Sequence, residues 1–270
     1  MNQFAAFELH VSIAAQELFK IGSFPVTNAM LTGLVGLLIT VGIFFYVGGK
    51  VKKDRYNRFV GLIQWVFEGL LKSIHDIIPD RTLARKITPL AVTIFFFVLI
   101  SYWLSIIPGL ETIFLNGVPL IRSLTADLNF TLGLAIITIV TVQIYAIKHM
   151  GILRNAGRYF RNPIKDPIGA FEGILELIGE ASRGTALALR LFGNAFAGEA
   201  LLIVIGVLTS YFASVVLPFF MAFELFIGFI QAYVFFVLTL IFTALAVSHH
   251  GEPSSDHSPA LKPKKAVRQR

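Results

Sequence analysis

The chain has 270 residues, of which 56% are hydrophobic and 14% charged, with a formal net charge of +7 and no cysteine. A soluble domain carries about 25% charged residues. This composition, together with apolar runs of membrane-spanning length, excludes a soluble globular protein and indicates an all-α integral membrane protein. Without cysteine there are no disulfides and no thiolate metal ligands, and we expect neither a metal nor a cofactor.

The first residues give no sign of a cleaved signal peptide. The opening MNQFAAFELHVSIAAQ lacks both the basic segment and the compact apolar segment of such a peptide. We therefore expect the first long apolar run to remain in the protein as a membrane helix. Residues 1–26 would then form an external N-terminal segment ahead of a membrane domain over residues 27–248.

The positive charges are clustered along the chain. They concentrate in residues 50–86, 148–165 and 262–270, whereas 108–124 and 208–217 together carry one, Arg122. Basic clusters in short loops stay on the cytoplasmic side. The pattern predicts an external N-terminus, a cytoplasmic C-terminus and five crossings. The positive charge is thus a topology signal, and we expect no nucleic-acid binding.

In chain order, the first predicted span covers residues 27–48, close to the ~20 residues needed to cross a bilayer. Residues 57–78 place apolar side chains at helical spacing with charged ones opposite, which predicts an amphipathic helix on the cytoplasmic membrane surface. A sixth span is the alternative, but it would put the flanking basic clusters on opposite sides. Residues 87–107 and 128–147 are predicted to form a hairpin of two spans.

The last two predicted helices are longer than a membrane requires. Residues 167–207 contain no proline after Pro167, and such a helix would be ~60 Å long, twice the ~30 Å hydrocarbon core. It must break, leave the membrane or lie strongly tilted. The second helix, 218–247, begins at Pro218, a residue suited to a helix start. Residues 249–270 are polar and basic, and are predicted to form a disordered cytoplasmic tail.

Three charged residues fall inside the apolar part of these two helices, Arg190, Glu199 and Glu224. An ionisable group at the bilayer centre costs ~2.5–3.5 kcal/mol, so three of them indicate a function. Arginine keeps its proton at physiological pH, which makes Arg190 a fixed positive charge, whereas a carboxyl group can relay protons. The alternative for Arg190 is an ion pair to Glu199 or Glu224 that only holds two helices together. The alternative for the two glutamates is that they remain protonated and have a purely structural role.

Further polar residues accompany these charges at helical spacing. Glu199 follows Arg190 by nine residues, which places it about half a revolution round the helix and ~13 Å along it. Glu224 and Gln231 are seven residues apart and share a face, while Asn194 and Gln231 are either polar lining or interhelical contacts. A stripe at intervals of four or three residues is predicted to share one face. Its members are Glu172, Glu176, Glu180, Arg183, Leu187, Arg190 and Asn194.

Two motifs carry a family resemblance. RLFGNAFAGE, at 190–199, together with ELFIGFIQAYVFFVLT, at 224–239, resembles subunit a of the F-type ATP synthase. TADLNFTLGL, SYWLSIIPG and PVTNAM are similar to segments of its bacterial members, and the resemblance covers roughly residues 20–248. The chain departs from the family pattern at three positions. Tyr102 and Ser105 lie in a segment where the family often has Asn and Gly, and Ala195 stands where Met is common.

The resemblance implies a proton-translocating stator subunit that performs no covalent catalysis alone but is essential to a proton-transporting two-sector ATPase. Arg190 would face the carboxylate of a rotating c-ring, keep it ionised and block a proton leak between two aqueous half-channels. Glu199 and Glu224 would be proton relays, and Asn194 and Gln231 polar neighbours of the arginine. Glu176 would be an acid of the cytoplasmic half-channel.

The same resemblance implies the partners and the location. The partners would be the c-ring, subunit b of the peripheral stalk, the other synthase subunits and the lipid bilayer, in a bacterial plasma (inner) membrane. A secondary ion transporter with a charged site at mid-membrane is the main alternative. Such transporters show internal repeats and broken helices, whereas the chain shows no repeat and its two long helices lack a central proline. A scaffold with purely structural charges is a second alternative.

Overall fold

A computed structural model describes residues 15–107, 113–115, 118–159 and 166–248. The tail predicted to be disordered, with its histidines, and residues 1–14 lie outside these ranges. The described helices are α1 (Asn28–Lys52), α2 (Arg58–Ile77), α3 (Arg81–Ile106), α4 (Leu128–Met150), α5 (Ile152–Tyr159), α6 (Pro167–Thr209) and α7 (Ala213–Ser248), with the short 3-10 helix η2 (Ser210–Phe212) between α6 and α7.

Five of these helices, α1, α3, α4, α6 and α7, are long and apolar enough to cross a membrane. This confirms the predicted class, an all-α integral membrane protein. The amphipathic helix α2 is not among the five. Two small antiparallel hairpins and helix α5 were not predicted; the hairpins are β1 (Glu17–Ile21) with β2 (Phe24–Thr27), and β3 (Phe114–Leu115) with β4 (Val118–Pro119).

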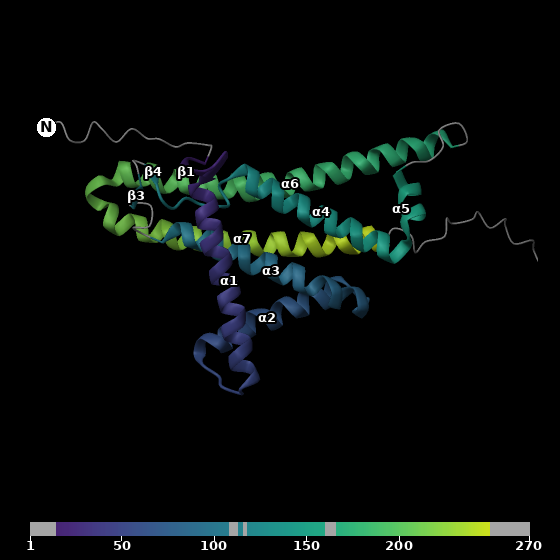
Figure 1. The fold of residues 1–270 in the computed structure, drawn as a ribbon, viewed down its shortest axis with the longest axis horizontal. Helices are drawn as coiled ribbons and strands as arrows, with labels where there is room; N and C mark the ends of the chain where they lie inside the picture. The colour runs from purple at the N-terminus through teal and green to yellow at the C-terminus, as the bar shows by residue number, and fades with distance from the viewer. Residues whose placement is uncertain (1–14, 108–112, 116–117, 160–165, 249–270) are drawn as a thin grey trace, which may run out of the picture.

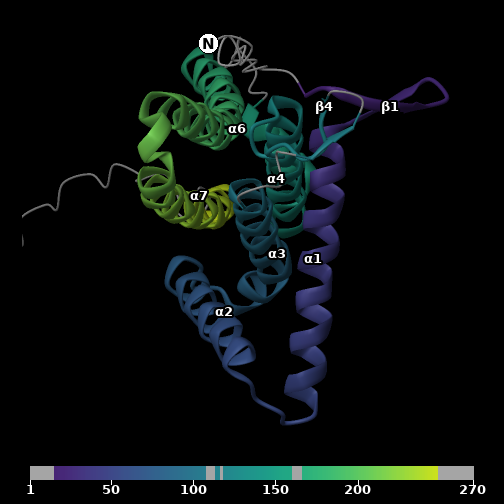
Figure 2. The same cartoon turned by 90° about the vertical axis from the view of Figure 1, so that its left-hand side faces the viewer.

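Helices α6 and α7 form an antiparallel hairpin that runs across the direction of α1 (Figures 1 and 2). Helix α6 is continuous over 43 residues and α7 over 36. At about 1.5 Å per residue they are roughly 65 and 54 Å long, well beyond a ~30 Å hydrocarbon core. Of the three possibilities for 167–207, the unbroken helix rules out a break and leaves a strong tilt or an extension beyond the membrane.

The core lies where α3 and α4 pack against the α6–α7 hairpin. Phe95 of α3 is fully buried, and its ring centroid lies 6.2 Å from that of Phe236 and 6.0 Å from that of Phe229, in edge-to-face contacts. Helix α1 lies at the side of this core and approaches it through small residues. A Cβ on Gly36 would lie 2.9 Å from Ser101 Oγ of α3, so glycine there allows the close approach of the two helices.

Two predicted helix starts are wrong, and in both cases a proline misled the prediction. Helix α3 starts at Arg81 rather than near residue 87, because the Asp80 side chain accepts a hydrogen bond from Thr82 N at 2.8 Å and caps the helix. This bond, with His149 3.5 Å away, lowers the pKa of Asp80. Helix α7 starts at Ala213, and Pro218 lies in its second turn, where only one backbone hydrogen bond is lost.

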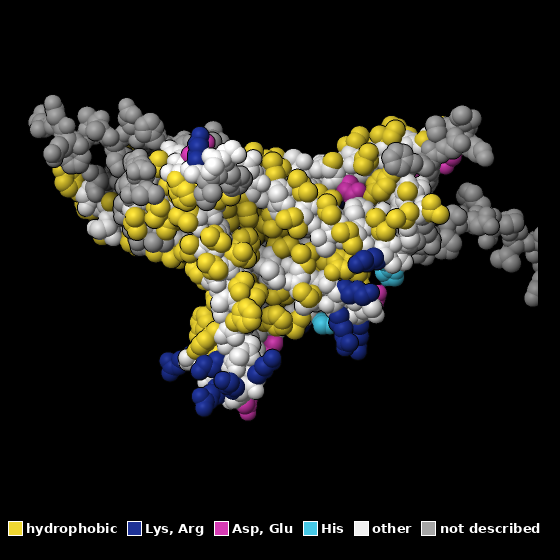
Figure 3. Space-filling model, viewed as in Figure 1, with side chains coloured by type: hydrophobic (Ala, Val, Ile, Leu, Met, Phe, Trp, Pro, Cys, Tyr) yellow, Lys and Arg dark blue, Asp and Glu magenta, His cyan; other side chains and the backbone are white. Residues whose placement is uncertain are grey.

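The basic side chains gather at one edge of the molecule, at the far end of α1, around α2 and at the start of α3 (Figure 3). Hydrophobic side chains cover the middle of the same face. Separation of a basic edge from an apolar middle is the distribution that the positive-inside rule describes.

Candidate functional site

Arg190 lies on a face of α6 that stays exposed along most of the helix. Glu172, exposed as well, lies 18 residues or about five turns before Arg190 on the same side of the helix, but from Gly173 to Thr209 Arg190 is the only exposed charged residue of α6. The other exposed members of this face recur every three or four residues, as one side of an α-helix requires. They are Phe171, Leu175, Ile178, Ser182, Ala186, Leu189, Arg190, Asn194, Ala197, Leu201, Val204 and Leu208. The arginine therefore projects from an apolar surface and not into the core of the chain.

Within the described residues, Arg190 forms no hydrogen bond and no ion pair. In particular, neither Glu199 nor Glu224 pairs with it, so the alternative in which an internal ion pair fastens the helices finds no support in this structure. A positive charge on an apolar surface, without a partner in the described chain, can be neutralised by an anionic group of another molecule.

The predicted polar stripe does not share one environment. Leu187 is fully buried and Arg183 half-buried, whereas Arg190 and Asn194 are exposed. The reason is what packs against α6, since a Cβ on Gly184 would overlap Ile139 of α4, whereas Arg190 is exposed. The residues therefore have the spacing of one helix face, as predicted, but they differ in what surrounds them.

Asn194 and Gln231 meet at the seam between α6 and α7. The Asn194 amide Nδ2 donates a hydrogen bond to Gln231 Oε1 at 2.6 Å. Gln231 is buried and Asn194 exposed, so the bond joins the exposed face of α6 to the interior of the hairpin. It places this pair one turn beyond Arg190, as neighbours of the arginine.

Glu224 is buried where α3, α6 and α7 meet. Its carboxylate Oε1 accepts a hydrogen bond from the Tyr102 hydroxyl of α3 at 2.5 Å. A Cβ on Gly198 of α6 would overlap the same carboxylate. The glutamate therefore occupies a space that α6 leaves open only because residue 198 is glycine.

Glu199 follows that glycine and is half-buried. Its Oε2 atom is buried and makes no hydrogen bond with the described residues. The charge of Arg122, a buried residue from the segment between α3 and α4, acts on this carboxylate. Glu199 is thus within electrostatic reach of a cation other than Arg190, from a different part of the chain.

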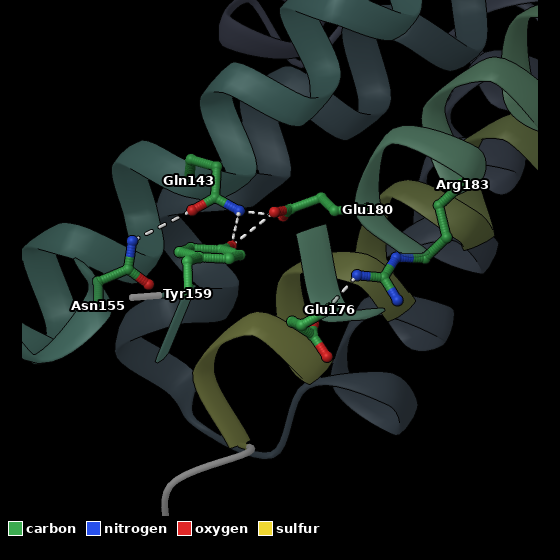
Figure 4. A network of polar contacts seen from close by, with 6 residues as sticks. All are labelled: Gln143, Asn155, Tyr159, Glu176, Glu180 and Arg183. Atoms are coloured by element: carbon green, nitrogen blue, oxygen red, sulfur yellow. Dashed lines mark hydrogen bonds and ion pairs between the residues drawn. The ribbon is translucent and has the colours of Figure 1, made fainter. Parts of the chain in front are cut away.

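Glu176 lies in a cavity between α4, α6 and α7. The cavity is toward the C-terminal ends of α4 and α7 and the N-terminal end of α6. The cavity has a volume of about 30 Å³, which exceeds the roughly 10–15 Å³ that one water molecule needs. Arg183 Nη2 donates a hydrogen bond to Glu176 Oε1 at 3.3 Å (Figure 4). The lining consists of Ile139, Val142, Glu176, Glu180, Arg183, Phe242, Leu245 and Ala246.

A second carboxylate of this cavity, Glu180, is held by a polar network (Figure 4). The Tyr159 hydroxyl of α5 donates to Glu180 Oε2 at 2.5 Å, and the Gln143 amide of α4 donates to Glu180 Oε1. Asn155 Nδ2 donates in turn to Gln143 Oε1 at 3.2 Å. The short helix α5 therefore supports the cavity from outside the long helices.

Comparison with known proteins identifies this arrangement. The family model described as "ATP synthase A chain" matches residues 29–244, which include all of α1 but its first residue, α2 to α6 and most of α7. The chain belongs to this family.

Curated relatives agree with the family match over most of their length. "ATP synthase subunit a" of Mycobacterium bovis is 30% identical over 232 residues, which cover 83% of this chain and 90% of that protein. The proteins of the same name from Acidothermus cellulolyticus and Desulforamulus reducens are 28% identical over 230 residues and 30% over 222. The respective coverages are 85% and 79% of this chain, and 80% and 78% of those proteins. As a member of the subunit a family, the chain is a multi-pass membrane subunit of an ATP synthase.

For this member of the ATP synthase A chain family, sequence reasoning missed three elements of the site. Tyr102 was noticed only as a departure from the family pattern, and Arg122 only as a loop charge. Glu180 was part of the polar stripe, without a role. The partner of Tyr102 lies 122 residues away along the chain, so no local pattern connects the two. The one available signal was an unusual tyrosine in the segment SYWLSIIPG.

The glycine at 198 yields a prediction for this subunit. Gly198→Ala is expected to displace the Glu224 carboxylate and lower ATP-driven proton pumping, because the new Cβ occupies the carboxylate's place. Gly206→Ala in the same helix is the matched control, since its Cβ would meet Leu217 at an ordinary 3.8 Å. Pumping in inverted vesicles, normalised to assembled complex, checks this, and equal pumping by both variants would contradict it.

Proposed function

We propose that this subunit is the stator part of the proton path, in which Arg190 faces a carboxylate of the rotating c-ring. The observation that carries the proposal is the exposed position of Arg190 on a mostly apolar face, without a partner in the described chain. A lone charge in hydrocarbon costs about 2.5–3.5 kcal/mol. A carboxylate supplied by another subunit on that face would offset this cost.

A fixed charge at this place has a defined effect on protons. Guanidinium stays protonated, so Arg190 holds a facing carboxylate in its ionised form and repels an approaching proton. A protonated ring site then cannot pass the arginine directly and has to travel round the ring. A gradient worth about 2.3 kcal/mol per charge per 100 mV is thereby coupled to rotation instead of leaking.

Two polar regions on opposite sides of Arg190 support the two proposed half-channels. Toward η2 lie Glu199 and the buried Glu224, which we assign as proton relays. Toward the basic edge lies the cavity with Glu176, fourteen residues or ~21 Å before Arg190. Asn194 and Gln231 are the polar neighbours of the arginine, hydrogen-bonded to each other across the seam.

The orientation follows from the charges. We propose that the basic edge faces the cytoplasm, with the N-terminus outside and the C-terminus inside, in a bacterial plasma (inner) membrane. Besides the c-ring, the proposed partners are subunit b of the peripheral stalk, the other synthase subunits and the lipid bilayer. The ring-facing surface is the exposed face of α6 that contains Arg190.

A secondary ion transporter fits the same residues less well. Such a protein binds its substrate between broken helices near mid-membrane. Here α6 is continuous and Arg190 points to the outside of the chain, which suits a partner subunit and not an enclosed substrate.

Cysteine cross-linking tests the proposed ring surface. The chain has no cysteine, so any cross-link from this subunit must form at an introduced cysteine. The two variants are Ala186→Cys and Ala197→Cys, on the exposed face either side of Arg190. In vesicles with a cysteine beside the ring carboxylate, oxidation is expected to join these positions to the c subunit. Ile137→Cys, also at an exposed position but on α4, is the control and should not cross-link. Cross-linking from α4 alone would contradict the proposed surface.

A further inference from the structure

We propose that Tyr102 is a positioning residue for Glu224, whose hydroxyl holds the relay carboxylate in a fixed place at the junction of α3, α6 and α7. This inference rests on the proposed function, in which Glu224 carries protons. Tyr102 is one of the positions where the chain departs from the pattern of its family, so the family resemblance assigns it no role.

The contact itself is short and protected from solvent. The phenolic O–H of Tyr102 donates to Glu224 Oε1 at 2.5 Å, and the two residues are 2% and 4% exposed. Hydrogen bonds from an O–H group to a carboxylate are shorter and stronger than those between neutral groups. A carboxylate bonded in this way keeps one orientation, which is what transfer of a proton along a set path requires.

Two glycines make room for the pair. A Cβ on Gly228, one turn after Glu224 on α7, would lie within 3.0 Å of three ring carbons of Tyr102. A Cβ on Gly198 of α6 would overlap the Glu224 carboxylate. The tyrosine ring thus packs against α7 at one glycine, and the carboxylate fills the space at the other.

The neighbouring residues fix the register of the two helices. Trp103, directly after Tyr102, donates from Nε1 to the backbone oxygen of Leu225, directly after Glu224, at 2.9 Å. Adjacent residues of α3 therefore bind adjacent residues of α7. With α3 and α7 held in this register, the Tyr102 hydroxyl reaches the carboxylate and not a neighbouring backbone group.

The test distinguishes the contribution of the Tyr102 hydroxyl group from that of its aromatic ring. Tyr102→Phe keeps the ring in its place and removes only the donor. In vesicles containing the complete synthase, we expect ATP-driven proton pumping per assembled complex to fall about tenfold, as for a barrier raised by ~1.4 kcal/mol. Incorporation of 4-aminophenylalanine at position 102 restores an N–H donor at the same ring position, and we expect it to recover most of the pumping.

The matched control is Tyr145→Phe. The Tyr145 hydroxyl donates to the backbone oxygen of Lys86 at 2.8 Å, so this variant also loses one tyrosine hydrogen bond between helices, but away from Glu224. Its pumping is expected to equal that of the unmodified chain. A loss that is the same in both phenylalanine variants would show a general structural effect and would overturn the positioning role.

Two further results would also overturn the proposal. One is full pumping by Tyr102→Phe, and the other is a failure of 4-aminophenylalanine to recover pumping in an assembled complex. Arg190→Ala, measured in the same vesicles, distinguishes the two levels of the account. If it pumps normally, the proposed function is wrong; if it fails to pump while Tyr102→Phe is unimpaired, only the positioning role is wrong.

Discussion

Glu224→Gln is expected to stop ATP-driven proton pumping while leaving the complex assembled. Glutamine has nearly the same shape, and its carbonyl oxygen can accept the hydrogen bond from Tyr102 that Glu224 Oε1 accepts at 2.5 Å. The packing of α3, α6 and α7 around residue 224 is therefore retained. An amide does not take up and release protons at physiological pH, so the proposed relay is interrupted.

The loss should be large because residue 224 can hold no titratable proton once its carboxyl group is replaced by an amide. We expect pumping per assembled complex to fall at least tenfold, roughly what 1.4 kcal/mol of added barrier produces. Quenching of a pH-sensitive dye in inverted vesicles measures it. Glu68→Gln, which changes an exposed glutamate of α2, is the control. Pumping by Glu224→Gln at the control level would show that Glu224 carries no protons.

Arg190→Ala is expected to abolish pumping with equal assembly. The side chain forms no hydrogen bond or ion pair within the described residues, so its removal breaks no such bond within that part of the subunit. What it removes is the fixed charge that we propose faces the ring. Arg190→Gln should behave in the same way, because it keeps a polar side chain but not the charge.

The same reasoning sets the scale of this effect and its control. Without the arginine, the ring carboxylate is no longer held in its ionised form, and rotation loses its link to proton flow. Pumping is expected to fall at least about tenfold. Leu208→Ala, on the same exposed face of α6, should retain pumping. A loss of assembled complex with Arg190→Ala, seen by immunoblot, would instead favour a structural role.

The fold was largely predictable because membrane insertion depends on simple quantities. Apolar length and the distribution of basic residues indicated five spans and a surface helix. A helix over residues 167–207 was predicted from the absence of proline after Pro167, with a break left open, and α6 is continuous over 43 residues. The errors arose at the starts of two helices, which depend on local capping and on the place of a proline. Asp80 caps α3 ahead of Pro89, and α7 tolerates Pro218 in its second turn.

The site was predictable only in part. Arg190, Glu199 and Glu224 could be selected because charges in an apolar segment are costly. The surroundings of these residues could not be predicted. The Tyr102–Glu224 contact depends on how helices distant in the sequence pack, and on glycines whose role is visible only in three dimensions. The exposure of Arg190 was equally hidden, because a helical stripe does not reveal which part of it a neighbouring helix covers.

The most direct test of the central claim is passive proton flux through the membrane sector, in vesicles stripped of the soluble sector, with an imposed membrane potential. If Arg190 is the barrier between two half-channels, Arg190→Ala should conduct protons at least as fast as the unmodified chain although it no longer pumps. Adding Glu224→Gln should remove that flux. A proton-tight membrane with assembled Arg190→Ala complex, or unimpaired pumping by that variant, would contradict the account.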